Sequence, residues 1–152
     1  FVTDGYNFRN MEINAVLGLS QLKNLDSSII ERKNNFDRFI KLINYPEFDI
    51  DFKTKGNSSF ILPFICKSTE LKNKLEKYLA GNGIETRPLC SGNLLRQPFL
   101  QYLDIDLKDY PKVDALHFKG FYIGNNHLIT EEDWLKLEHL MTEFMYLYRK
   151  RE

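Results

Sequence analysis

The feature that most constrains this chain is a long apolar stripe with a helical period near its start. The stripe consists of Ala15, Leu19, Leu22, Leu25, Ile29, Phe36, Ile40 and Ile43. It is long for a single globular helix. Ser28 and Glu31 have the spacing of a capping box, in which two side chains satisfy free donors at a helix start. We therefore predict one helix that ends near Asn24 and a second from Ser28 to about Asn44, with most of the stripe packed in a core.

The remainder of the chain alternates strand patterns with helix patterns. Pro63 interrupts the first strand pattern, and because proline cannot donate to a ladder, that strand should lie at a sheet edge or carry a bulge. The predicted elements are a strand over 60–66, a helix capped by Ser68 and closed by Gly81 and Gly83, a strand over 84–87, a short helix over 113–118, a strand over 120–124, and a last helix that starts at Thr130.

The last helix shows the clearest local signals. Thr130 and Asp133 have capping-box spacing. The helix is expected to bury one apolar face, made of Leu137, Leu140, Met141, Phe144 and Tyr148. The order of elements predicts an α/β fold, a small two-layer sandwich in which helices cover one face of a sheet of about three strands. We expect residues 1–44 to form a long N-terminal helical arm and residues 45–152 a small α/β domain.

Charge and composition exclude several classes of partner. The chain has 21 basic and 21 acidic residues, so it carries no surplus charge for nucleic acid or an anionic membrane. With 43% hydrophobic residues it has the composition of a globular protein, and no apolar run reaches the length of a membrane span. A cytoplasmic location is expected. Cys66 and Cys90 lack ligand spacing to any His or Cys, so we predict two buried thiols, no metal site and no disulfide framework.

Three short segments have the character of a ligand site. The first, 5–22, is a glycine-led polar turn that runs into an apolar helix, an arrangement that presents free N–H groups to an anion. Taken alone, this pattern is more often a helix start that binds nothing. The second segment joins Gly-Ile-Glu-Thr-Arg-Pro at 83–88 to Ser-Gly-Asn-Leu-Leu-Arg-Gln-Pro at 91–98, and the third is Phe-Tyr-Ile-Gly-Asn-Asn-His at 121–127.

These three segments, in this order, resemble the DegT/StrS family of pyridoxal-phosphate enzymes, which act on nucleotide sugars. The resemblance covers nearly the whole chain but only the C-terminal part of a family member. It implies the C-terminal domain of a fold type I pyridoxal-phosphate enzyme, linked to a missing upstream large domain. A homodimer and a nucleotide-sugar substrate are also implied.

The resemblance assigns roles to three residues of the first segment. Asn7 is expected to hydrogen-bond the cofactor phosphate in the partner subunit's active site, whereas the alternative is an ordinary turn residue. Arg9 is either a solvated charge or a planar clamp for the phosphates of the substrate. Tyr6 is expected to contact the substrate.

Further substrate contacts are expected in the other two segments. Arg87 lies where the resemblance implies a strand end near the active site, although an exposed Arg usually has no such role. Ser91 and Asn93 belong to a turn-forming triplet that faces the sugar in this family, and a plain loop is the alternative. His127 follows the third strand, where a lone histidine is more often solvated than functional.

The resemblance places the reacting groups outside the chain. The lysine that forms the Schiff base, or the histidine that replaces it in dehydratases, lies upstream of residue 5 in the family. Pyridoxal phosphate should therefore be bound mainly by the upstream domain, no catalytic residue is assigned here, and the chain alone should be inactive.

Two reactions and one non-enzymatic role stay open. Aminotransferases of the family carry a histidine two residues before Gln97–Pro98, where this chain has Leu95. That departure favours a dehydratase, which removes the C3 hydroxyl of a 4-keto-6-deoxy sugar, over an aminotransferase. The alternative is a non-catalytic interaction or regulatory module that kept the fold.

Overall fold

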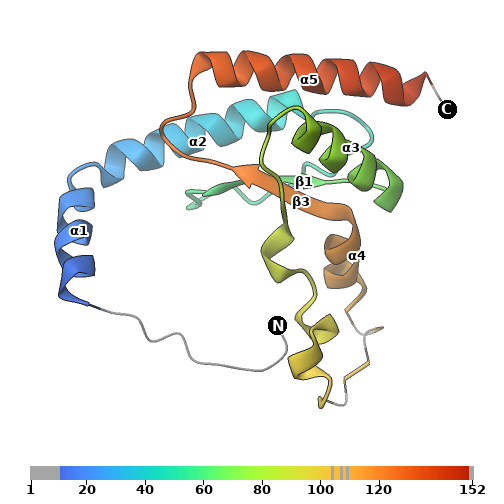
Figure 1. Ribbon diagram of the computed structural model, residues 1–152, viewed down its shortest axis with the longest axis horizontal. Helices are drawn as coiled ribbons and strands as arrows, with labels where there is room; N and C mark the ends of the chain where they lie inside the picture. The colour runs from blue at the N-terminus through green and yellow to red at the C-terminus, as the bar shows by residue number, and fades with distance from the viewer. Residues whose placement is uncertain (1–10, 104, 107, 109, 151–152) are drawn as a thin grey trace.

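A computed structural model describes residues 11–150 of the chain except 104, 107 and 109. The elements follow one another along the chain as Figure 1 shows. They are α1 (Glu12–Leu22), α2 (Leu25–Leu42), β1 (Ile61–Ile65), α3 (Thr69–Gly81), β2 (Arg87–Pro88), the 3-10 turns η1 (Leu89–Ser91), η2 (Leu94–Arg96) and η3 (Pro98–Leu100), α4 (Pro111–Lys119), β3 (Gly120–Gly124) and α5 (Glu131–Arg149).

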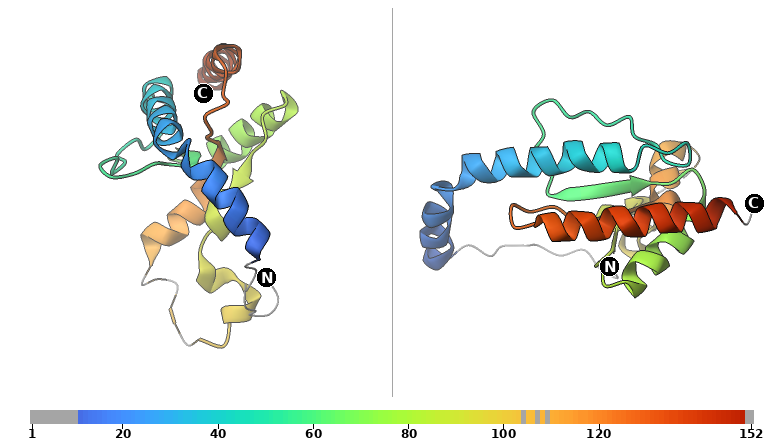
Figure 2. Two further views of the ribbon diagram at one scale, coloured as in Figure 1. Left: turned by 90° about the vertical axis from the view of Figure 1, so that its left-hand side faces the viewer. Right: turned by 90° about the horizontal axis from the view of Figure 1, so that it is seen from above.

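The three strands form an antiparallel sheet in the order β1-β3-β2. Pro63 pairs with Tyr122, and Tyr122 pairs with Arg87. Helices α2, α3 and α5 lie on one side of the sheet, whereas η1–η3 and α4 extend from its other side (Figures 1 and 2). The two-layer α/β sandwich predicted from the sequence is thus confirmed.

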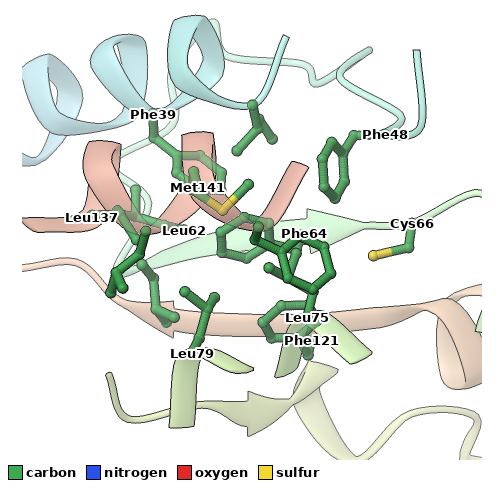
Figure 3. Close-up of a cluster of buried hydrophobic side chains, with 14 of the residues drawn as sticks. Phe39, Phe48, Leu62, Phe64, Cys66, Leu75, Leu79, Phe121, Leu137 and Met141 are labelled. Atoms are coloured by element: carbon green, nitrogen blue, oxygen red, sulfur yellow. The ribbon is translucent and has the colours of Figure 1, made fainter. Parts of the chain in front are cut away.

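The core lies between the sheet and the three covering helices (Figure 3). Phe64 and Phe121 stack at 4.7 Å between ring centroids, and Phe39 of α2 meets Phe64 edge-on at 4.9 Å. Leu62 on β1 and Ile123 on β3 point to the same side as these phenylalanines, because alternate residues of a strand share a face. Each such side chain contributes about 1.5–3 kcal/mol when fully buried.

Strand β1 is an edge strand, as Pro63 predicted. The N–H of Asn125 donates to the carbonyl of Phe60, and the N–H of Cys66 donates to the carbonyl of Lys119, so even-numbered residues of β1 pair with β3. Odd-numbered residues therefore direct their backbone groups to the free edge. Pro63 lies at one of these positions, where the missing N–H costs no ladder bond.

The break between the first two helices is three residues earlier than predicted. Helix α2 begins at Leu25 rather than Ser28, and α1 ends at Leu22. The N–H of Ser28 donates to the carbonyl of Asn24, so Ser28 lies inside the first turn and does not cap it. The predicted capping box with Glu31 is wrong, because a Ser-to-Glu spacing also occurs within helices.

Strand β2 is shorter than predicted and consists of Arg87–Pro88 only. Residues before it complete the end of α3. The N–H of Gly83 donates to the carbonyl of Ala80, and the N–H of Ile84 donates to that of Leu79, which is the pattern of a Schellman motif. Gly83 adopts φ +78° there, as its predicted role in closing the helix requires. Ile84 packs against the core instead of pairing in the sheet.

The predicted caps of α3 and α5 are confirmed. The hydroxyl of Ser68 accepts from the N–H of Leu71 at 3.1 Å. In α5 the hydroxyl of Thr130 accepts from the N–H of Asp133, whose carboxylate accepts from the N–H of Thr130 at 2.8 Å. That backbone donor lowers the pKa of Asp133. The expected apolar face of α5 is buried, except that Tyr148 is only half-buried.

Helix α1 differs from the others because all its residues are exposed. The prediction that most of the apolar stripe packs in a core is therefore wrong for Ala15, Leu19 and Leu22. Val16 and Leu19 keep 66% and 67% of their surface in solvent. In Figure 1 the helix turns away from α2 and does not pack on the sheet. Among residues 11–150, as far as they are described, no helix has both the length and the apolar character needed to cross a bilayer.

Candidate functional site

The candidate site residues of the first predicted segment lie before the described part of the chain. Tyr6, Asn7 and Arg9 are outside the described residues. Their proposed contacts with cofactor and substrate therefore stay predictions. The described candidates are Arg87, Asn93 and His127, together with the backbone of Ser91, whose side chain lies outside what the structure describes.

Arg87 lines a pocket of about 230 Å³ on the sheet. The other lining residues are Phe60, Glu85, Tyr122 and Gly124. Tyr122 lies between Phe121 and Ile123, which both point into the core, so its ring is on the opposite face of the sheet. This face is the one from which η1 and α4 extend (Figure 1).

The guanidinium of Arg87 is exposed and is already paired. It forms an ion pair with the carboxylate of Glu85 at 2.6 Å, and this hydrogen-bonded contact raises its pKa above the ordinary value. An exposed pair of this kind contributes little to stability, so the arginine can exchange its partner for a ligand. Its five donors suit the paired oxygens of a phosphate.

Two aromatic residues of this pocket were missed by the sequence reasoning. Phe60 is 62% exposed, which is unusual for a phenylalanine. Tyr122 on β3 pairs directly with Arg87 on the neighbouring strand β2. Aromatic faces next to an arginine can hold a base or a sugar ring. The alternation of the strand pattern places Tyr122 opposite Phe121, but only the strand pairing shows that it meets Arg87.

The second predicted segment forms two 3-10 turns that pack on α4. Asn93 is 2% exposed, and its side-chain oxygen accepts from the N–H of Leu95 at 3.0 Å. Its side-chain nitrogen donates to the carboxylate of Asp114 at 3.2 Å. Both ends of the amide are therefore used within the fold, which the sequence did not indicate.

Arg96 is also held by α4. Its Nε and Nη2 donate to the two oxygens of Asp114 at 2.5 and 2.7 Å, and its guanidinium lies 4.7 Å from the ring centroid of Phe118. The hydrogen bond from Arg96 lowers the pKa of Asp114. Asp114 is thus an acceptor for two residues of the same segment.

His127 is exposed in the loop between β3 and α5, and it is not among the residues that line the Arg87 pocket. Its neighbour Asn125 is buried and donates to the carbonyls of Arg32 and Ser59 at 2.9 and 2.8 Å. Asn35 donates to Asn125 at 3.1 Å. This network fixes the loop that carries His127.

The two cysteines differ in environment. Cys66 is buried, and this burial raises the pKa of its thiol to about 12. Cys90 is exposed, so the prediction of two buried thiols is wrong for this residue. Cys90 lies in η1, which packs outside the core on the second face of the sheet (Figure 1). In the described part of the chain, no three His, Cys, Asp or Glu side chains gather as metal ligands would.

Comparisons with known proteins identify relatives of this chain. The chain is 33% identical over 143 residues to GDP-4-keto-6-deoxy-D-mannose 3-dehydratase of Escherichia coli O55:H7, an alignment that covers 90% of this chain and 37% of that enzyme. A crystal structure of GDP-4-keto-6-deoxymannose-3-dehydratase with a trapped PLP-glutamate geminal diamine is 31% identical, with a TM-score of 0.72 over 91% of this chain and 38% of the other.

A more distant structure supports the fold alone. The apo form of the putative sugar aminotransferase Spr1654 from Streptococcus pneumoniae has a TM-score of 0.75 at 22% identity, over 97% of this chain and 39% of that protein. The chain thus spans less than two-fifths of the length of these relatives. Residues 2–139 match the DegT/DnrJ/EryC1/StrS aminotransferase family. The chain therefore belongs to this family, and it corresponds to the C-terminal part of the family's fold.

Proposed function

We propose that this chain is the C-terminal domain of a pyridoxal-phosphate-dependent enzyme that removes the C3 hydroxyl from a nucleotide-linked 4-keto-6-deoxy sugar. The observation that carries the proposal is its 33% identity, over 90% of the chain, to a GDP-4-keto-6-deoxy-D-mannose 3-dehydratase. The enzyme is proposed to be a cytoplasmic homodimer. Its sugar and nucleotide are those of a surface-polysaccharide precursor.

The dehydratase is favoured over an aminotransferase by the residue at position 95. Leu95 lies in η2, and its aliphatic side chain can neither donate nor accept a proton where aminotransferases of the family carry a histidine. The aminotransferase is the second candidate, because GDP-perosamine synthase of Escherichia coli O157:H7 is 30% identical over 86 residues, or 56% of this chain.

The described residues do not form a complete site for pyridoxal phosphate. The sheet pocket is lined by Phe60, Glu85, Arg87, Tyr122 and Gly124, none of which can form a Schiff base with the cofactor. We infer that the upstream domain anchors the cofactor and that Asn7 contributes a hydrogen bond to its phosphate in the partner subunit. Replacing Asn7→Ala in the full-length enzyme should weaken cofactor binding by about 1–3 kcal/mol, and an unchanged dissociation constant would contradict this role.

The sheet pocket is proposed as part of the substrate wall. Arg87 would exchange its pairing with Glu85 for a substrate phosphate, while Tyr122 and Phe60 offer aromatic faces to the sugar or base. The amide of Asn93 is engaged within the fold, so its contribution to the substrate comes through the shape of its segment. Further proposed contacts are Tyr6, Arg9, Ser91 and His127.

Helix α1 supports the proposal that a larger enzyme surrounds this domain. Its apolar residues point in all directions and are exposed, whereas a helix that is apolar all round is normally buried on several sides. We propose that it inserts between the α/β domain and the upstream domain. The residues before it, including Asn7, would thereby reach the active site.

The reaction can be tested with the full-length enzyme, an amino donor and a nucleotide-linked 4-keto-6-deoxy sugar. Mass spectrometry should detect a 3-deoxy product, whereas a stable aminosugar would identify the aminotransferase instead. Absence of any turnover with bound cofactor would favour a non-catalytic module. The chain alone should form no borohydride-trapped Schiff base at a specific lysine.

A further inference from the structure

Helix α4 holds the segment 92–96 through side chains that the sequence reasoning did not assign to the site. The N–H of Asn93 donates to Nδ1 of His117 at 3.1 Å. The side-chain nitrogen of Asn93 and the guanidinium of Arg96 both donate to Asp114. One helix therefore binds this segment at its backbone and at two of its side chains.

The backbone next to this contact has a shape that needs support. Gly92 adopts φ +67°, and a Cβ at this position would lie 2.0 Å from Nδ1 of His117. Cys90 adopts φ +42°, which among the described residues makes it the single non-glycine residue with a positive φ. Non-glycine residues in this region carry strain and persist only where their surroundings hold them.

His117 is the contact on which the backbone position depends. Asn93 is almost fully buried, and Nδ1 of His117 is the acceptor that satisfies its N–H. Nδ1 must be the acceptor nitrogen, since the N–H of Asn93 donates to it. The absence of a side chain at Gly92 leaves room for the ring. Gly92, Asn93 and His117 are therefore in direct contact, although more than twenty positions separate His117 from the other two.

We propose that His117 and Asp114 are positioning residues for substrate binding, because they hold segment 92–96 in the conformation that faces the nucleotide sugar. This proposal rests on the proposed function, in which the segment lines the substrate site. The imidazole fixes the backbone at Asn93, and the carboxylate fixes the side chains of Asn93 and Arg96. Neither residue needs to touch the substrate.

The test compares two replacements of His117 in the full-length enzyme. His117→Leu replaces the acceptor with an apolar side chain of similar length. His117→Asn places a carbonyl oxygen close to the position of Nδ1, so it should restore the hydrogen bond. His139→Leu is the matched control, because His139 is exposed on α5 and away from this segment.

Two measurements are made on each variant. Hydrogen-exchange mass spectrometry of peptides covering 89–97 reports whether the segment is held. In His117→Leu exchange should be roughly tenfold faster, and KM for the nucleotide sugar should rise roughly tenfold with kcat nearly unchanged, the size of effect expected for one lost hydrogen bond. His117→Asn and His139→Leu should resemble the unmodified enzyme in both measurements.

The outcomes separate this proposal from the function on which it rests. Unchanged exchange in His117→Leu would overturn the positioning role, whatever the kinetics. Faster exchange with an unchanged KM would show that the segment is held but does not serve substrate binding, which also overturns the proposal. If the unmodified enzyme turns over no nucleotide sugar, the proposed function fails and the substrate role fails with it, whereas the exchange data still decide whether His117 holds the segment.

Discussion

Asn125 joins parts of the chain that no short-range signal connects. Its side chain reaches the carbonyl of Arg32 at the start of the core-facing part of α2 and the carbonyl of Ser59 before β1. Asn35 donates to Asn125 and accepts from the indole of Trp134 on α5 at 3.3 Å. Buried polar networks of this kind are costly when they are incomplete. Asn125 and Asn35 together therefore connect α2, the residue before β1, the end of β3 and α5.

Replacing Asn125→Ala should lower the free energy of unfolding by about 2–4 kcal/mol, because two part-buried carbonyls lose a donor and the amide of Asn35 loses one of its two acceptors. Urea denaturation followed by tryptophan fluorescence measures the change. Asn73→Ala, on an exposed position of α3, is the control and should shift stability by no more than about 0.5 kcal/mol. Equal midpoints for the two variants would contradict the structural role of Asn125.

At the scale of the element, the capping box of α5 makes a measurable contribution. Thr130→Ala removes the acceptor for the N–H of Asp133 and should lower the free energy of unfolding by about 1 kcal/mol. Thr142→Ala is the matched control within the same helix, since its hydroxyl only bonds back to the carbonyl of Glu138. Because alanine favours a helix interior, this control should be neutral or slightly stabilising. Equal losses in thermal unfolding experiments would argue against the cap.

Elements with local start and stop signals were predictable from the sequence, and those set by distant contacts were not. Ser68, Thr130 and Gly83 act within one helical turn, so their roles could be inferred without the fold. Strand β2 was placed too early, because Ile84 closes α3 before the chain can pair with β3. The start of α2 was misplaced because a Ser-to-Glu spacing also occurs inside helices.

The candidate site was only partly predictable for the same reason. The sequence pointed to Arg87 and Asn93, yet it did not indicate Tyr122, which meets Arg87 only through strand pairing. Nor did it indicate His117 as the acceptor for Asn93, since 24 positions separate the two residues. Side chains can be proposed from motifs, whereas their partners depend on the tertiary fold.

At the scale of the whole molecule, the α/β domain should be stable without α1. A chain that begins at Leu25 should unfold at nearly the same temperature as the full chain, because no residue of α1 is buried. Isolated helices of this length are marginal in water, so amides of α1 should exchange rapidly in the chain alone. In the full-length enzyme the same amides should be protected. Rapid exchange in both proteins would contradict the proposed insertion of α1.

Acid should weaken the domain through carboxylates that are hydrogen-bonded in the folded state. Arg149 donates to Glu47 and lowers its pKa below the ordinary 4.5, and the pKa of Asp133 lies below 3.8. A lowered pKa contributes stability that is present above the unfolded-state value and is lost as the pH falls through the folded-state value. The free energy of unfolding should therefore fall as the pH drops below about 5. Glu47→Gln should make this decline shallower, and an unchanged slope would contradict the assignment.

The edge position of Pro63 bears on how this domain behaves at high concentration. An exposed strand edge normally offers a row of donors and acceptors with which a second molecule can assemble. Here Pro63 removes a donor from that row, and the carbonyl of Ile65 is already occupied by the N–H of Asp49. Fibrillar association through β1 is therefore disfavoured, and the exposed apolar residues of α1 form a surface through which isolated domains would associate.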